Sequence, residues 1–89
     1  MAKKRRKLNK DFEKQIYSSK KNVELVLAKI YDIDDEDIQK EYMTAFNVVV
    51  KLYDGLKEHY EQQGFNENSD VLLGNYKNAF NLFESEFEI

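Results

Sequence analysis

Residues 35–64 read "DEDIQKEYMTAFNVVVKLYDGLKEHYEQQG", and this stretch decides the fold. Apolar side chains recur in it every three or four residues, which is the period of one face of an α-helix. That face consists of Ile38, Tyr42, Ala45, Val49, Leu52 and Leu56. Asp34 or Asp35 is suited to cap the start of such a helix, and Gly64 is suited to end it. We therefore predict a helix over about residues 35–63.

The apolar face of this helix is unusually wide. Phe46, Tyr53 and Tyr60 lie beside the main line at seven-residue intervals, and Val48 and Val50 flank it on opposite sides. A helix with so wide an apolar face usually contacts more than one neighbour. We therefore expect it to be the central helix of the fold.

A shorter amphipathic pattern lies on each side of the central helix. Asn9 is suited to cap a helix over about 9–31, and the polar segment "GFNENS" precedes a second one over about 69–87. Their apolar stripes are Phe12, Ile16, Ser19, Val23, Val26 and Ile30 in the first, and Leu73, Tyr76, Phe80, Phe83 and Phe87 in the second. Helices joined by short connections pack antiparallel. The sequence thus predicts an all-α fold, an elongated three-helix up-down-up bundle with a basic N-terminal arm.

Charge divides the chain into two parts. Residues 1–10, "MAKKRRKLNK", carry a net charge of +6, whereas residues 11–89 carry −9, so the whole chain has −3. We expect residues 1–8 to be a flexible basic arm and residues 9–89 to be a single helical domain. In an up-down-up bundle the arm projects from one pole. The other pole then collects the carboxylates Asp32, Asp34, Asp35, Glu36, Asp37, Glu84, Glu86 and Glu88.

The basic arm is a candidate contact for nucleic acid. Its candidate phosphate-binding residues are Lys3, Lys4, Arg5, Arg6 and Lys7. No aromatic side chain is interleaved among them to stack on a base, and no helix-turn-helix pattern is evident, so binding of this kind would not depend on base sequence. A targeting signal, an anionic membrane contact and a solvated terminus remain open alternatives.

The acidic connection "DIDDED" has two interpretations. Its carboxylates can cap the following helix, or Asp34, Asp35 and Asp37 can form a surface that meets a basic partner. A calcium-binding loop beginning at Asp32 is excluded, because Asp37 occupies the position that needs glycine and Met43 the position that needs glutamate.

The sequence contains few of the side chains on which catalysis commonly depends. The chain has no cysteine, and His59 is its only histidine. Nucleophile–base pairs of the Ser–His or Cys–His type and His/Cys metal sites are therefore not indicated. We expect no catalytic residues, no metal, no cofactor and no enzyme activity.

The hydropathy pattern indicates a cytoplasmic protein. No run of 18 apolar residues predicts a membrane span. The basic start is followed by "LNKDFEK" rather than by the apolar run of a secretory signal. The abundance of Asn, Lys, Ile and Tyr suits a chain of phage or plasmid origin.

Three apolar residues lie away from the predicted core stripes and form a candidate partner surface: Leu25, Val71 and Leu82. Together with the wide apolar face of the central helix they favour a small non-catalytic helical protein that acts through protein–protein interaction, as a regulator, inhibitor or accessory factor. The same surfaces would also serve a homodimer. The alternative is a sequence-nonspecific nucleic-acid-binding accessory protein that uses the basic arm.

Overall fold

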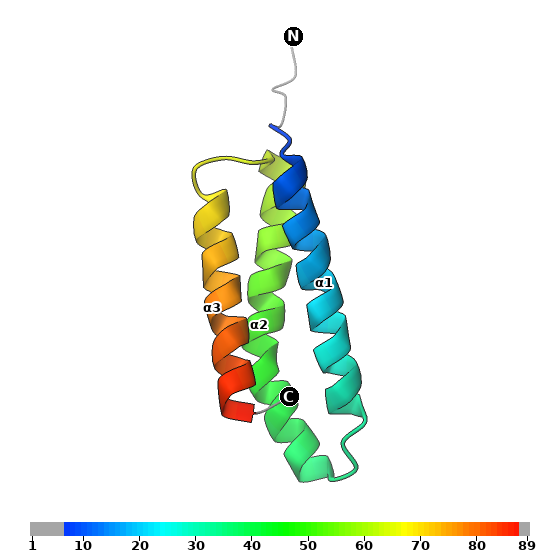
Figure 1. Ribbon diagram of the computed structural model, residues 1–89. Helices are drawn as coiled ribbons and strands as arrows, with labels where there is room; N and C mark the ends of the chain where they lie inside the picture. The colour runs from blue at the N-terminus through cyan, green and yellow to red at the C-terminus, as the bar shows by residue number, and fades with distance from the viewer. Residues whose placement is uncertain (1–6, 88–89) are drawn as a thin grey trace.

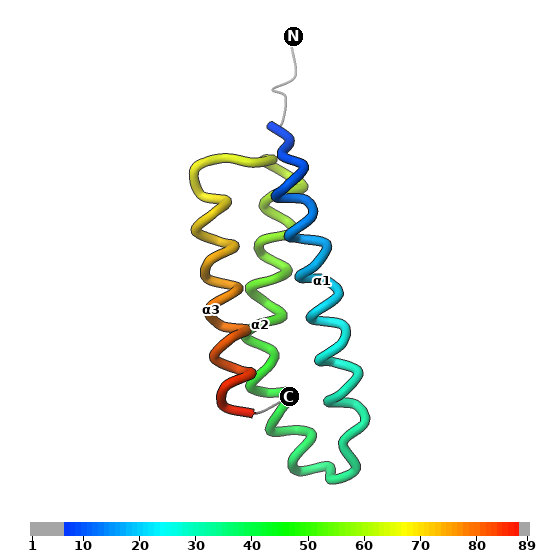
Figure 2. Tube along the Cα trace, viewed as in Figure 1, coloured from blue at the N-terminus to red at the C-terminus, as the bar shows by residue number. Residues whose placement is uncertain are grey.

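The computed structural model describes residues 7–87, which form three helices: α1 (Lys10–Tyr31), α2 (Glu36–Gln63) and α3 (Ser69–Phe87). Consecutive helices are antiparallel, as in an up-down-up bundle, and α2 lies between the other two (Figures 1 and 2). The molecule is elongated, with extents of 56 × 22 × 18 Å. The predicted all-α three-helix bundle is confirmed. Most of the basic arm, residues 1–6, lies outside the described residues.

The capping residues predicted from the sequence define the starts of α1 and α2. Asn9 Oδ1 accepts a hydrogen bond from the Phe12 N–H at 3.0 Å. Asp35 Oδ1 accepts from the N–H groups of Asp37 and Ile38, at 2.9 and 3.1 Å. These bonds satisfy amides that have no partner within the helix. Each helix therefore begins one residue after its cap.

Gly64 ends α2. Its backbone has φ 72° and ψ −161°, a combination that essentially only glycine adopts. Its N–H donates to the carbonyl of Tyr60 at 2.8 Å, which closes the last turn. The chain then turns into the connection that leads to α3.

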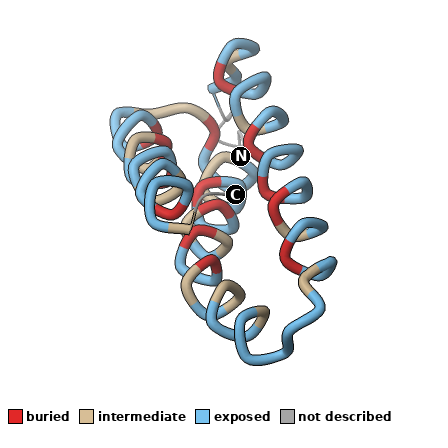
Figure 3. The backbone as a smooth tube through the Cα atoms, turned by 60° about the horizontal axis from the view of Figure 1, so that its bottom comes forward, coloured by how far each residue is buried: buried red, intermediate tan, exposed pale blue. Residues whose placement is uncertain are grey.

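The core lies between α2 and its two neighbours (Figure 3). It contains apolar side chains from all three helices: Phe12, Val23, Val26, Ile30, Phe46, Val49, Tyr53, Leu56, Leu73, Tyr76 and Phe83. Aromatic rings fill the end where α3 stops: the ring centres of Phe46 and Phe83, of Phe83 and Phe87, and of Tyr42 and Phe87 are each 4.8 Å apart. Burying a large apolar side chain contributes about 1.5–3 kcal/mol, so this core is the main source of stability.

One residue of the predicted core stripe is not in the core. Ile38 is 44% exposed. The hydroxyl of Tyr42 donates to the carbonyl of Phe87 at 3.3 Å, so the end of α3 lies level with Tyr42, one turn after Ile38. The first turn of α2 therefore extends beyond α3 (Figure 1).

The start of α1 is fastened to the connection between α2 and α3. The Phe65 N–H donates to the Lys7 carbonyl at 2.6 Å. The Tyr60 hydroxyl accepts from the Asn9 N–H at 3.0 Å and donates to the Glu13 carboxylate at 2.6 Å. Flexibility of the arm as far as residue 8 stays a prediction, although the backbone of Lys7 is paired with the body.

Candidate partner-binding groove

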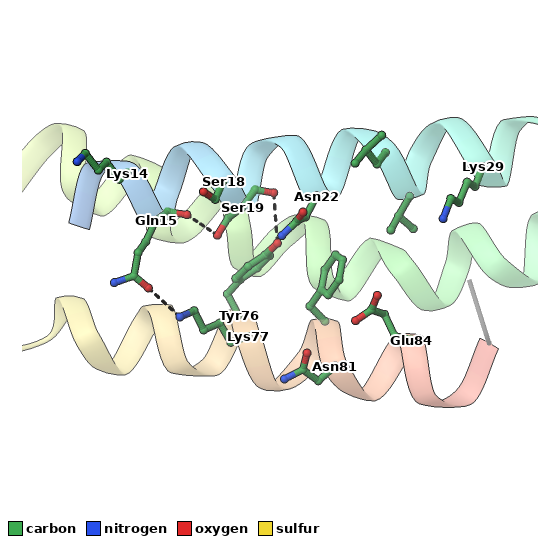
Figure 4. Close-up of a pocket in the computed structure, with 13 residues that line it drawn as sticks. Lys14, Gln15, Ser18, Ser19, Asn22, Lys29, Tyr76, Lys77, Asn81 and Glu84 are labelled. Atoms are coloured by element: carbon green, nitrogen blue, oxygen red, sulfur yellow. Dashed lines mark hydrogen bonds between the residues drawn. The ribbon is translucent and has the colours of Figure 1, made fainter. Parts of the chain in front are cut away.

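A groove runs between α1 and α3. Both helices pack against α2, but within residues 7–87 no Cα atom of α1 lies within 8 Å of a Cα atom of α3. The space between them is an open groove of about 560 Å³ (Figure 4). Side chains of α3 reach α1 across it, Tyr76 to Ser19 and Lys77 to Gln15.

Tyr76 forms the floor of this groove. Its side chain is almost fully buried, and its hydroxyl donates to the carbonyl of Ser19 on α1 at 3.3 Å. Ser19 is small and turns its own hydroxyl to the carbonyl of Gln15, at 2.8 Å, so it leaves room for the tyrosine ring. Burial raises the pKa of the Tyr76 phenol, because the charged form would lose its hydration. The floor is therefore neutral and mainly apolar.

The walls of the groove combine apolar and polar side chains. Leu25 stands on the α1 wall and is 62% exposed, and Phe80 is half-buried on the α3 side. Lys77 crosses the groove and donates to Gln15 Oε1 at 2.7 Å. A shallower hollow of about 400 Å³ shares Leu25 and continues past Tyr31 toward the end of α1. An apolar centre with a polar rim is the usual anatomy of a protein interface.

The structure does not gather the predicted partner-surface residues into one patch. Leu25 lines the groove, whereas Val71 and Leu82, which are 59% and 60% exposed, lie on α3 but do not line it. Asp34, Asp35 and Asp37 are exposed at the connection between α1 and α2. The Asp35 carboxylate is already used in the cap described above. A partner surface at any of these residues stays a prediction.

Of the predicted phosphate-binding residues, Lys3, Lys4, Arg5 and Arg6 lie outside the described residues. Lys7 is exposed. Five further lysines, which were not among the predicted phosphate-binding residues, are exposed on α1: Lys10, Lys14, Lys20, Lys21 and Lys29. The amino group of Lys21 lies 4.8 Å from the centre of the Tyr17 ring, a cation–π contact.

His59 forms a pair that was not predicted. Its Nε2 lies 3.2 Å from the Oγ of Ser69, which also accepts a hydrogen bond from the Asn66 N–H at 2.9 Å. Ser69 is fully buried, so a substrate cannot reach its hydroxyl. The pair fastens the connection between α2 and α3. The sequence contains one indication of this pair: His59 and Ser69 are each five residues from the turn at Gly64.

Two other kinds of site are absent from the part of the chain that the structure describes. No three His, Asp or Glu side chains there are grouped closely enough to hold a metal ion. No helix there has the length and apolar character needed to cross a membrane. Comparison with protein-family models, with curated proteins and with solved structures finds no match for this chain. The functional proposal therefore depends on the groove.

Proposed function

We propose that this protein is a small, non-catalytic interaction protein that binds a helix of another protein in the groove between α1 and α3. The observation that carries the proposal is the separation of these two helices, which leaves Leu25 exposed beside an apolar floor. Binding of an amphipathic helix in an apolar groove is a recurrent mode of recognition. A fourth helix here would complete a four-helix bundle.

The dimensions of the groove suit a helix of about four turns. On α1 its lining extends from Lys14 to Lys29, which at ~1.5 Å per residue corresponds to roughly 22 Å. Such a protein would regulate, inhibit or assist its partner by binding one of the partner's helices. The compartment that we propose for it is the cytoplasm.

Two leucines of similar exposure make a matched test. Leu25 lines the groove and Leu82 lies outside it, and both are about 60% exposed. We expect the partner captured from the source cells by the wild-type protein to be retained by Leu82→Glu and absent with Leu25→Glu. Circular dichroism would check that both variants remain folded. The opposite result, loss of capture with Leu82→Glu alone, would move the interface to the outer side of α3 and contradict the groove proposal.

Charge distribution favours a second candidate function, sequence-nonspecific binding of nucleic acid. Residues 1–31 contain ten basic and three acidic side chains, whereas residues 32–89 contain four basic and fourteen acidic ones. The exposed lysines of α1 thus lie in the same part of the sequence as the basic arm. Binding through phosphates alone depends steeply on salt concentration.

A mobility-shift assay with duplex DNA over a salt series tests the second candidate. The variant Lys10→Gln/Lys14→Gln/Lys21→Gln should bind more weakly than wild type and show a smaller salt slope, by ~0.9 for each phosphate that it no longer neutralises. The matched control, Lys40→Gln/Lys51→Gln/Lys57→Gln, changes the net charge equally on α2 and should bind as wild type does. Absence of any shift at low salt would exclude this function.

A further inference from the structure

We infer that the groove selects an acidic amphipathic helix of a partner protein, with carboxylates flanking the apolar stripe that enters the groove; this inference rests on the proposed function. Three lysines and one carboxylate line the groove: Lys14, Lys29, Lys77 and Glu84. The groove is therefore locally positive, although residues 11–89 carry −9 overall. This local reversal of sign is the first observation in favour of an acidic occupant.

No ion pair among the described residues engages the three lysines of the groove. Lys77 donates to the uncharged amide oxygen of Gln15. Lys14 and Lys29 stand toward opposite ends of the α1 wall, with Lys77 facing them from α3 (Figure 4). A helix lying between these walls brings its flanks close to all three amino groups. Carboxylates on those flanks gain attraction, whereas lysines there would be repelled.

The position of Glu84 gives the occupant a direction. Glu84 lies in the half of the groove nearer Lys29, whereas Lys14 and Lys77 lie in the other half (Figure 4). The two halves therefore differ in charge. The carboxylates of the bound helix should concentrate at the end that lies beside Lys14 and Lys77.

A second copy of the chain fits the groove less well than a partner helix does. The apolar residues on the outer side of α3, Val71 and Leu82, are eleven positions apart. Asn75 and Asn78 occupy the positions between them where a groove-binding helix needs apolar anchors. The proposed occupant of the groove is therefore a helix from another protein.

Two designed peptides of matched length test the inference. Both carry the same leucine stripe at helical spacing over roughly 15 residues, the length of the groove lining; one has glutamate and the other lysine at the remaining positions. Binding to the full chain would be measured by fluorescence anisotropy of labelled peptides, and its location by amide chemical shifts around Leu25, Tyr76 and Phe80. We expect the acidic peptide to bind this location at least about tenfold more tightly, with an advantage that shrinks as salt screens the charges.

Charge reversal supplies the matched variants. Lys14→Glu/Lys29→Glu/Lys77→Glu should reverse the preference between the peptides. Lys40→Glu/Lys51→Glu/Lys57→Glu, with the same net charge but its changes on α2, should keep it. Circular dichroism of both variants separates loss of selectivity from loss of folding.

Each other result overturns the inference in a distinguishable way. Equal binding of both peptides in the groove would overturn the charge selectivity and leave the proposed function standing. Failure of both peptides to shift the groove resonances would overturn both proposals. A solution mass that doubles with concentration, with the same resonances shifting in the absence of peptide, would identify a second copy as the occupant. Displacement of the acidic peptide by duplex DNA would replace the protein partner with nucleic acid.

Discussion

Tyr60 joins the end of α2 to the start of α1 through its hydroxyl and its ring. It accepts from the Asn9 backbone and donates to the Glu13 carboxylate, while its ring lies 5.4 Å from that of Phe12. The variant Tyr60→Phe keeps the ring and removes both hydrogen bonds. We expect a loss of about 1–2 kcal/mol in the free energy of unfolding, measured by urea denaturation. Tyr17→Phe, on an exposed ring, is the control and should lose less than about 0.5 kcal/mol.

Buried tyrosines at the interface of all three helices make the free energy of unfolding depend on pH in the alkaline range. Burial raises the pKa of both Tyr53 and Tyr76, and neighbouring carboxylates raise that of Tyr53 further. Above the ordinary tyrosine pKa of about 10, the unfolded chain releases these protons while the folded chain keeps them. The free energy of unfolding should therefore be unaffected by these groups below that pH and fall as pH rises above it.

The double variant Tyr53→Phe/Tyr76→Phe tests this pH dependence. It should be less stable at neutral pH, because it lacks the bond from Tyr76 to Ser19, and should show a shallower decline at alkaline pH. Denaturant titrations of wild type and variant at several pH values would measure both effects. Parallel declines in the two proteins would show that other groups cause the pH dependence.

Single residues differ in how well sequence reasoning could place them. The caps at Asn9 and Asp35 could be predicted because a cap bonds amides two or three residues away. The bond from Tyr76 to Ser19 spans 57 positions, so it depends on how two helices are placed. The pairing of Lys7 with Phe65 could not be predicted for the same reason.

At the scale of one element, a glycine inside α2 and the glycine that ends it have opposite expected effects. Gly64 has positive φ, whereas a Cβ added at Gly55 would meet no atom within 4 Å. Gly64→Ala should destabilise the protein by about 1–3 kcal/mol, because alanine is strained in that conformation. Gly55→Ala should stabilise it by about 0.5–1 kcal/mol, because the helix interior favours alanine. Thermal and urea unfolding of both variants checks the contrast, and a stabilised Gly64→Ala would contradict it.

The period and the ends of the helices could be predicted from the sequence. The exposure of Ile38 could not, because it depends on the relative lengths of α2 and α3. Ile38 follows the apolar period of α2 correctly. It is exposed because its neighbour α3 ends one turn short, at Phe87. Periodicity describes which face a residue occupies, and only the packed structure says whether another helix covers that face.

At the scale of the whole molecule, α2 should be the most protected helix. It packs closely on both neighbours, whereas the backbones of α1 and α3 do not approach within 8 Å of each other among residues 7–87. Hydrogen exchange monitored by mass spectrometry should find the slowest amides over residues 46–56. The fastest should lie over residues 32–38, where the connection is exposed and α2 extends beyond α3. Slower exchange in α1 than in α2 would contradict this order.

The central place of α2 could be predicted from its wide apolar face, but the groove could not. The stripes of α1 and α3 read like those of any bundle helix. The distance between the two helices depends on side chains such as Tyr76 and Ser19 that meet only in the folded state. The helical period places Leu25 off the stripe, and the structure adds that it stands on the wall of a groove.

The separation of α1 from α3 also bears on how quickly the chain folds. Close approach of helix backbones joins only consecutive helices among residues 7–87, so most native contacts close short stretches of chain. Proteins dominated by such local contacts fold in microseconds to milliseconds. The chain has no proline, so it has no slow prolyl isomerisation to wait for. Rapid-mixing or temperature-jump refolding should therefore show one fast phase, with no slow phase on the scale of seconds.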